Sequence, residues 1–154
     1  MGESAKPPKS NLQLDPIHTI QPHAPSRALR VLIADDYEAV RVGVCAVLGS
    51  RVDIDVCAQA KNGEEAVEKS IQLRPDLIIL DISMPGIGGV EAARQIRVFF
   101  PDVPILFFTM HNTPQLFAMA KSVGAQGFVT KDQMAVNLLQ AVDALRNKET
   151  FFSF

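Results

Sequence analysis

Five short apolar segments alternate with amphipathic helical patterns, and this alternation is the feature that most constrains the fold. The segments are residues 31–34, 54–58, 77–80, 103–108 and 127–129. Those at 31–34, 77–80 and 103–108 are apolar throughout, as expected of strands buried on both faces of a parallel sheet. The sequence therefore predicts an α/β fold in which five parallel strands are joined by right-handed helical crossovers that cover both faces.

Apolar residues recur at helical spacing after each strand segment. The residues that mark the five predicted helices are Val40, Val44, Val47 and Leu48; Ala66, Val67, Ser70 and Ile71; Val90, Ala93 and Ile96; Leu116, Phe117, Ala120 and Val123; and Ala135, Leu138, Val142 and Leu145. We expect Asn62 to cap the second helix, with Glu65 in capping-box position, and Asp132 to cap the fifth. Gly49 and Gly124 can end the first and fourth.

The chain divides into three parts by composition. Five of its ten prolines lie within residues 1–28, where no helix or strand period persists, so a disordered N-terminal arm is expected there. Residues 29–147 form the predicted folded domain. Residues 148–154 contain three of the nine phenylalanines and are expected to be a C-terminal tail or a truncated linker.

Charge and hydropathy exclude several classes of function. The net charge is -2, which leaves no basic surface for nucleic acid or an anionic membrane. No apolar run approaches the roughly 18 residues of a membrane-spanning helix. The polar N-terminus lacks the apolar stretch of a signal peptide, so a cytoplasmic location is expected.

Polar side chains follow four of the five strand segments. They are Asp35 and Asp36, Asp81, Thr109, and Thr130 and Lys131. Because parallel strands bring their carboxyl ends to one edge of the sheet, where ligands bind in such folds, we expect these side chains to converge. Each residue alone is more often a helix cap, a turn residue or a solvated charge, so the prediction depends on their joint occurrence.

Asp35, Asp36 and Asp81 form an acidic cluster in this arrangement. Three carboxylates in one cleft would retain protons unless a cation neutralised them. Mg²⁺, or Mn²⁺ in its place, suits an oxygen-only ligand set and takes one or two carboxylates with a phosphate oxygen. One carboxylate can then attack a phosphorus atom and form an acyl phosphate. Lys131 can neutralise a phosphoryl oxygen, and the Thr109 hydroxyl can donate a hydrogen bond to another.

Four motifs resemble the receiver domain of bacterial two-component response regulators. They lie at residues 31–36, 80–86, 108–109 and 127–131. The resemblance runs from about residue 30 to residue 147, and segment 80–89 with the Lys131-Asp132 pair is most similar to receivers of the NarL/FixJ type. It implies a flavodoxin-like (βα)5 fold, doubly wound, with a five-stranded parallel sheet in the order 2-1-3-4-5. It also identifies residues 29–147 as a receiver domain.

The resemblance implies a role for each site residue. Asp81 would be the phosphoacceptor. Asp36 and Asp81 would bind Mg²⁺ through their carboxylates and Ser83 through its backbone carbonyl, while Asp35 would act mainly through water. Lys131 would pair with the phosphoryl group, and Thr109 would move to meet it.

Phe128 stands at the position of the family's switch aromatic. In the family this ring turns inward when the threonine shifts, which couples the site to the fourth helix and fifth strand. The alternative is that Phe128 is only a core residue, and both descriptions can hold if two packings are close in energy. Where many receivers have a proline after the lysine, this chain has Asp132.

The implied function is a phosphorylation-dependent signalling switch. The phosphoryl group would come from a sensor histidine kinase or a phosphotransfer protein, and a homodimer could form on phosphorylation. The chain would not be an enzyme in the usual sense, because it would promote only its own aspartyl phosphorylation and dephosphorylation. DNA would be bound only through an output domain absent from this chain, which is either a fragment or a stand-alone receiver.

Three other functions remain open at this point. A phosphatase that forms an aspartyl phosphate would have a similar site, but typically places a second aspartate where Ser83 stands. A receiver that is never phosphorylated would serve only for docking. A flavodoxin-type cofactor site is disfavoured because Asn62-Gly63 is not a phosphate-binding glycine loop.

Overall fold

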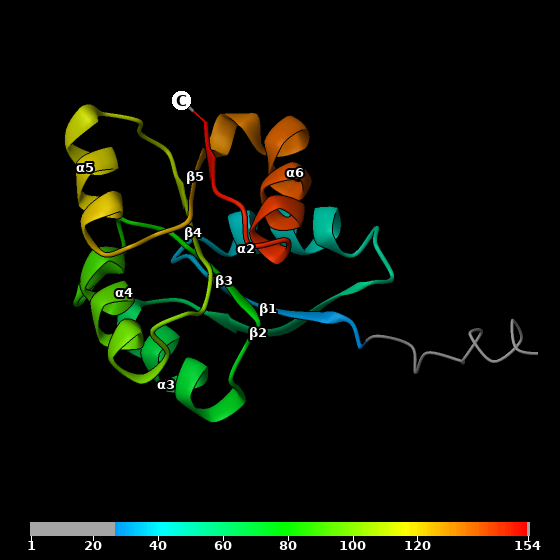
Figure 1. Cartoon of the computed structure of the whole chain (residues 1–154), viewed down its shortest axis with the longest axis horizontal. Coiled ribbons are helices and arrows are strands. Elements are labelled where there is room, and N and C mark those ends of the chain that lie inside the picture. The colour runs from blue at the N-terminus through cyan, green and yellow to red at the C-terminus, as the bar shows by residue number, and fades with distance from the viewer. Residues whose placement is uncertain (1–26, 154) are drawn as a thin grey trace, which may run out of the picture.

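The apolar segments form the strands of one parallel sheet in the computed structural model, which describes residues 27–153 (Figure 1). The strands are β1 (Leu29–Ala34), β2 (Ile54–Ala60), β3 (Leu77–Leu80), β4 (Ile105–Thr109), β5 (Gly127–Thr130) and β6 (Phe151–Phe152). The helices are α2 (Glu38–Leu48), α3 (Gly63–Leu73), α4 (Gly88–Phe99), α5 (Pro114–Ser122) and α6 (Met134–Arg146), and a 3₁₀ turn, η1, spans Lys131–Gln133.

The sheet has the order β2-β1-β3-β4-β5-β6. The predicted fold class and the order of the first five strands are therefore confirmed, but the predicted number of five strands is wrong. The additional strand is β6, which pairs in parallel with β5. It has only two residues, too few for an alternating pattern to reveal a strand in the sequence.

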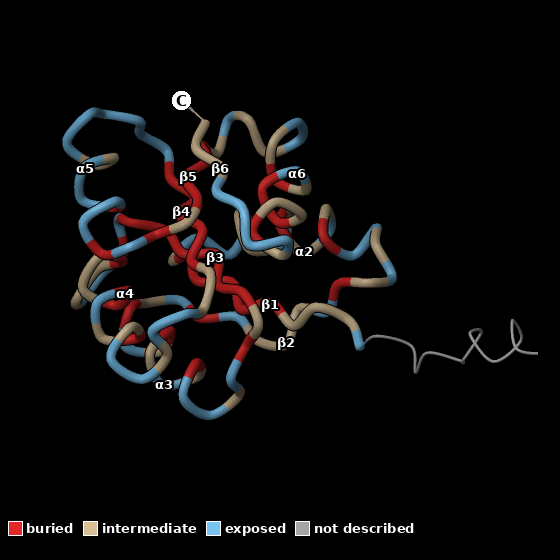
Figure 2. The backbone as a smooth tube through the Cα atoms, in the orientation of Figure 1, coloured by how far each residue is buried: buried red, intermediate tan, exposed pale blue. Residues whose placement is uncertain are grey.

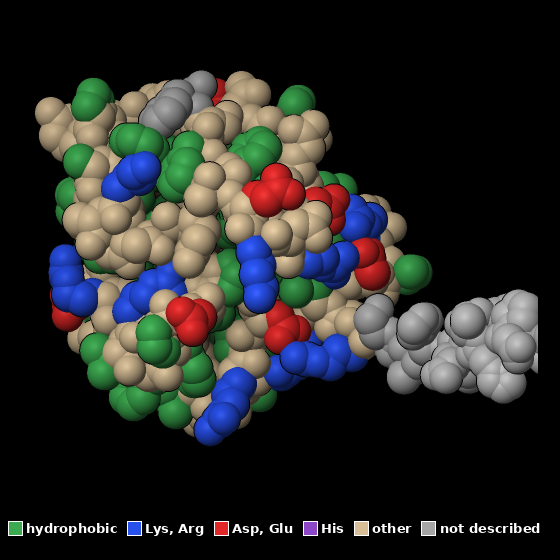
Figure 3. Space-filling model, viewed as in Figure 1, with side chains coloured by type: hydrophobic (Ala, Val, Ile, Leu, Met, Phe, Trp, Pro, Cys, Tyr) green, Lys and Arg blue, Asp and Glu red, His purple; other side chains and the backbone are tan. Residues whose placement is uncertain are grey.

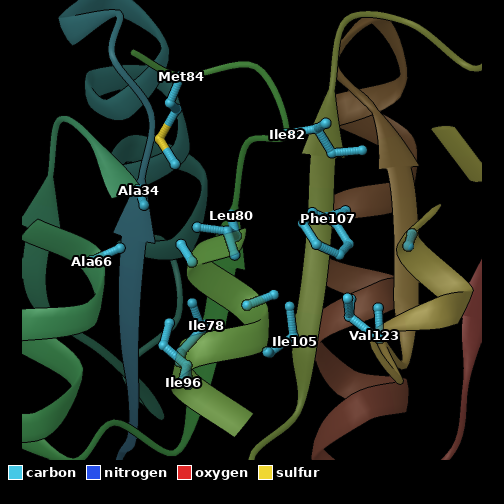
Figure 4. Close-up of a cluster of buried hydrophobic side chains, with 14 of the residues drawn as sticks. Ala34, Ala66, Ile78, Leu80, Ile82, Met84, Ile96, Ile105, Phe107 and Val123 are labelled. Carbon is cyan, nitrogen blue, oxygen red and sulfur yellow. The ribbon is translucent and has the colours of Figure 1, made fainter. Parts of the chain in front are cut away.

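Helices cover both faces of the sheet and enclose a separate apolar core on each (Figure 1). Helices α3, α4 and α5 pack on one face, where Leu80, Ile96 and Phe107 lie in the core shown in Figure 4. Helices α2 and α6 pack on the other, with Val44 and Leu138 buried against the sheet. Burial therefore follows the strands and the inner sides of the helices (Figure 2).

The helix ends agree with the sequence in part. The side chain of Asn62 accepts a hydrogen bond from the Glu65 amide at 2.8 Å, so this predicted cap is confirmed. The predicted cap at Asp132 is wrong, because α6 begins only at Met134 and has no side-chain cap. The chain first makes the 3₁₀ turn η1, which contains Asp132. Two residues assigned to inner helix faces, Ile71 and Ala135, are exposed.

The exterior of the described residues is mixed in charge. On the face shown in Figure 3, Lys and Arg side chains are interspersed with Asp and Glu side chains. None of the helices within residues 27–153 is long and apolar enough to cross a membrane. The arm predicted for residues 1–28 lies outside the described residues, except for its last two positions.

Arg97, in the last turn of α4, joins that helix to the segment that enters β5. Its guanidinium donates hydrogen bonds to the carbonyl of Gly124 and to the side chain of Gln126, both at 2.8 Å. It also donates to the carbonyl of Val103. The same Gln126 oxygen accepts the amide of Ile105 at 2.9 Å, so one arginine positions the starts of both β4 and β5.

We expect Arg97→Ala to destabilise the fold by about 2–4 kcal/mol, because several part-buried acceptors lose a charged donor at once. The matched control is Arg94→Ala on the same helix, whose exposed ion pair with Glu91 should contribute less than about 0.5 kcal/mol. Urea unfolding of both variants measures the difference. Equal loss of stability in the two variants would contradict this role for Arg97.

Candidate functional site

The topology brings the two aspartate-bearing strands side by side. β1 and β3 are neighbours in the sheet, and Ala34 is in register with Leu80. The next residue of each strand is an aspartate, and the Asp81 amide donates to the Ala34 carbonyl at 3.0 Å. The chain crosses from one side of β1 to the other between β2 and β3, which makes this the switch point where ligands bind in open α/β sheets.

Three carboxylates meet at this point. One carboxylate oxygen each from Asp35, Asp36 and Asp81 lies within 4.8 Å of the others. Asp35 and Asp81 are 2% and 3% exposed, so water screens their repulsion poorly. The sequence-based expectation that these side chains converge is met by the geometry.

Lys131 provides the positive charge next to the cluster. Its Nζ lies 2.6 Å from Asp35 Oδ2 and 3.2 Å from Asp81 Oδ2, and its side chain is only 8% exposed. Burial lowers the pKa of Lys131, but the two carboxylates outweigh burial and hold the pKa above its usual value. The lysine therefore stays charged in the site.

Asp81 differs from an ordinary aspartate. Burial raises its pKa, Lys131 lowers it, and Asp35 raises it again, with a net increase. The Ser83 amide also donates to Asp81 Oδ1, at 3.3 Å. Ionised Asp81 is thus held next to a fixed cation but has exchanged water for a less polar environment, which favours its reaction with an electrophile.

A cavity of about 490 Å³ opens beside these groups. Asp36, Asp81, Ser83, Thr109 and Lys131 all line it. Two of its polar atoms, Asp36 Oδ1 and Thr109 Oγ1, are buried and have no hydrogen-bond partner among residues 27–153. Buried polar atoms without partners are costly, so these atoms indicate a site that is completed by a ligand.

The donor set fits a hard divalent cation. The cluster consists only of oxygen ligands, and one lysine leaves it with an excess of negative charge. Asp36 Oδ1 accepts no hydrogen bond from any residue in the range 27–153, which leaves it able to bind a cation. A negatively charged pocket of oxygen ligands suits Mg²⁺.

A larger cavity, of about 870 Å³, lies at the opposite ends of the strands. Its lining includes Asp76 and Asp53, which pair with Arg27 and Arg146 at 2.7 and 2.6 Å. Hydrogen bonds from Arg51 and Arg146 hold the pKa of Asp53 well below its usual range. These carboxylates already have cationic partners, so we place the chemistry in the smaller cavity.

Two residues that support the site were not recognised from the sequence. Arg41 on α2 donates to the Asp35 carbonyl at 2.8 Å and to the Gln59 side chain at 3.1 Å, which fixes the acidic loop against β2. Gly89 on α4 packs so closely that a Cβ there would lie 1.9 Å from the Asp81 carbonyl oxygen. Each contact joins a helix to the aspartate that directly follows a strand, so it depends on how the helix packs and follows no periodic pattern.

Phe128 and Thr109 lie on adjacent strands. Thr109 pairs with Thr130 and Phe107 pairs with Phe128, so Thr109 and Phe128 are two positions apart on the same face. Phe128 is completely buried, and its ring packs edge-on against Phe117 at a centroid distance of 5.9 Å.

Curated relatives share the folded part of this chain. The Transcriptional regulatory protein LnrK of Bacillus subtilis is 39% identical over 114 residues, which cover 74% of this chain and 52% of that protein. The Oxygen regulatory protein NreC of Staphylococcus epidermidis is 39% identical over 125 residues, which cover 80% and 57%. The chain thus spans slightly more than half the length of these relatives.

Solved structures show the same fold. A LuxR-family two-component response regulator from Aurantimonas sp. has a TM-score of 0.77 and 33% identity, with 80% of this chain and 89% of that chain covered. The signal receiver domain of the putative response regulator NarL from Mycobacterium tuberculosis has a TM-score of 0.73 and 28% identity, with 79% and 98% covered.

The family described as the response regulator receiver domain matches residues 31–143. This range contains most of β1, all of β2 to β5, the acidic cluster, Thr109 and Lys131. Together with the relatives and the shared fold, the match establishes that this chain belongs to the response regulator receiver domain family, and that its relatives are of the NarL/LuxR type.

Proposed function

We propose that Asp81 accepts a phosphoryl group, in a Mg²⁺-dependent reaction, from a sensor histidine kinase or a phosphotransfer protein. The observation that carries the proposal is the convergence of a buried nucleophilic carboxylate, two further carboxylates, Lys131 and Thr109 on one cavity. Phosphoryl transfer requires mainly positioning and neutralisation of charge, and this site offers both.

The proposed reaction is a displacement at phosphorus. An oxygen of Asp81 forms the new O–P bond while the P–N bond to the donor imidazole breaks, and the bonding electrons remain on the imidazole nitrogen. Lys131 Nζ, already 3.2 Å from Asp81, pairs with a phosphoryl oxygen. The Thr109 hydroxyl, which has no partner among the described residues, donates to another.

The cation would be held by the carboxylates of Asp36 and Asp81 and by the backbone carbonyl of Ser83. Asp35 would act mainly through water, because its Oδ2 pairs with Lys131 at 2.6 Å. When bound, Mg²⁺, or Mn²⁺ in its place, supplies positive charge to the phosphoryl oxygens. Arg41 keeps the Asp35 backbone in position for this arrangement.

Phosphorylation would be transmitted through Thr109 and Phe128. When Thr109 moves to donate to the phosphoryl group, it leaves space on its face of the sheet, and Phe128 on the adjacent strand can shift into that space. The shift would change the surface formed by β5 and α5. The protein would thereby act as a switch and promote only its own phosphorylation and dephosphorylation.

The output of the switch is proposed from the relatives. Some have names that describe transcriptional regulation, and this chain spans slightly more than half of their length. We infer that DNA would be contacted only through an output domain outside residues 29–147, and that the phosphorylated receiver could form a homodimer. A cytoplasmic location fits a partner kinase whose phosphohistidine must reach this cavity.

We expect incubation with Mg²⁺ and acetyl phosphate to add one phosphoryl group, because the acyl phosphate can replace the phosphohistidine as donor. Intact-mass spectrometry measures the gain. Asp81→Asn and omission of Mg²⁺ should each abolish it. Asp102→Asn, which changes an exposed carboxylate just before β4, is the matched control and should leave it intact.

A mass gain that survives Asp81→Asn would contradict Asp81 as the acceptor. No gain at all would favour a receiver used only for docking. Multiple-turnover phosphate release from a phosphomonoester would instead favour a phosphatase.

We also expect Asp81→Asn to raise the Tm in the absence of Mg²⁺ by about 3–5 °C, the effect of roughly 1 kcal/mol in a domain of this size. The folded state raises the pKa of Asp81, so the ionised carboxylate costs stability at pH values above the ordinary pKa of an aspartate. Thermal unfolding at neutral pH measures the change, and Asp102→Asn should shift the Tm by less than about 1 °C.

Mg²⁺ should raise the Tm of the wild type by mass action, because only the folded chain assembles the three carboxylates. The increase should be much smaller in Asp36→Asn and Asp81→Asn, whereas an equal ionic strength of NaCl should not reproduce it. Equal Mg²⁺-dependent increases in the wild type and both variants would exclude this cluster as the cation site.

A further inference from the structure

The segment after α6 returns to the sheet instead of leading away from it. Lys148 adopts a left-handed backbone conformation with φ of 65°, which a residue with a side chain rarely adopts. This turn directs the chain along β5, where the Phe151 amide donates to the Gln126 carbonyl at 3.0 Å. The Ser153 amide donates to the Phe128 carbonyl at 2.8 Å, which completes the pairing of β6 with β5 (Figure 2).

Side chains on both sides also hold this segment. Phe152 packs edge-on against Phe117 of α5 at a centroid distance of 5.5 Å. Lys121 of the same helix places its Nζ 4.8 Å from the Phe152 ring centroid. On the other side, Asn137 of α6 donates to the Ser153 hydroxyl at 2.8 Å. β6 is therefore attached to α5, β5 and α6 together.

Two ring contacts and a shared sheet face link β6 to the proposed phosphorylation site. Phe152 contacts Phe117, and Phe117 contacts Phe128. Phe128 shares a sheet face with Thr109, whose hydroxyl lines the cavity beside Asp81. A strand of two half-buried residues at a sheet edge is stabilised little by burial. A small change in one of its contacts can therefore alter the fraction of molecules in which β6 is paired with β5.

We propose that residues 151–153 form a latch on β5 that phosphorylation releases. The inference rests on the proposed switch. Movement of Phe128 toward the space vacated by Thr109 withdraws one of the rings that Phe117 packs against, and Phe117 then supports Phe152 less well. Release exposes the β5 edge and frees residues 151–153, which in the latched state are held beside β5.

The first test measures amide hydrogen exchange in the full chain, with the phosphomimetic BeF3⁻ and Mg²⁺ as the probe. In the free protein the Phe151 and Ser153 amides should be protected by their hydrogen bonds. BeF3⁻ should accelerate their exchange by about tenfold or more, because β6 opens more often. Asp81→Asn should show no acceleration.

Binding of BeF3⁻ is checked separately by its effect on the Tm. If BeF3⁻ does not bind, the proposed phosphoacceptor site is contradicted. If it binds and the Phe151 and Ser153 amides exchange at an unchanged or slower rate, the latch is contradicted while the phosphoacceptor site stands.

The second test uses variants along the aromatic path. Phe152→Ala should give fast exchange at Ser153 with or without BeF3⁻, whereas Phe99→Ala, an exposed phenylalanine on α4, should behave as the wild type. Phe117→Leu keeps an apolar side chain but removes the ring, so it should reduce the acceleration caused by BeF3⁻. Full acceleration in Phe117→Leu would exclude Phe117 as the connection.

Thermodynamic reciprocity gives a third readout. If BeF3⁻ weakens the latch, loss of the latch must strengthen BeF3⁻ binding by a similar factor. Phe152→Ala should therefore bind BeF3⁻ more tightly than the wild type, by about the factor seen in the exchange experiment, and Phe99→Ala should not. Unchanged affinity in Phe152→Ala would show that β6 and the site are independent.

Discussion

The ion pairs of Lys131 with Asp35 and Asp81 are the interaction on which the rest of the site depends. Two nearly inaccessible carboxylates side by side repel each other strongly, and the lysine at the end of β5 supplies the positive charge that offsets this repulsion. Because the lysine satisfies only part of the negative charge, the cluster stays able to take a divalent cation. Burial of the ionised Asp81 carboxylate thus lowers the stability of the fold, while the same burial favours reaction of this carboxylate with an electrophile.

The parallel sheet makes this arrangement unavoidable once the strands are paired. Each strand presents its carboxyl end at the same edge, so groups from β1, β3, β4 and β5 meet without long loops. Close packing of α4 then fixes the segment after β3, because Gly89 leaves no room for a side chain beside the Asp81 carbonyl. Strand β5, which leads to Lys131 at the cavity, also pairs with β6 at the edge of the sheet.

The sequence predicted most of the fold because its signals are local and repeated. Continuous apolar segments identified the buried strands, and Asn62 with Glu65 identified a helix start that the structure confirms. Asp132 was wrongly predicted as a cap, because the 3₁₀ turn at Lys131–Gln133 delays the start of α6. β6 was missed because its pairing depends on a turn at Lys148 and on partners in α5 and α6.

For the candidate site, the sequence by itself determined which chemical groups lie at the strand ends: the three aspartates, Thr109 and Lys131 follow directly from strand periodicity and the rule for parallel sheets. Only the tertiary structure decided which of them touch. It paired Lys131 with Asp35 more closely than with Asp81, left Asp36 Oδ1 and Thr109 Oγ1 without a hydrogen-bond partner among the residues that the structure describes, and joined Arg41 to Asp35. It also connected Phe128 through Phe117 to Phe152. Periodicity specifies the direction in which a side chain points, whereas contact between distant residues depends on how whole elements pack.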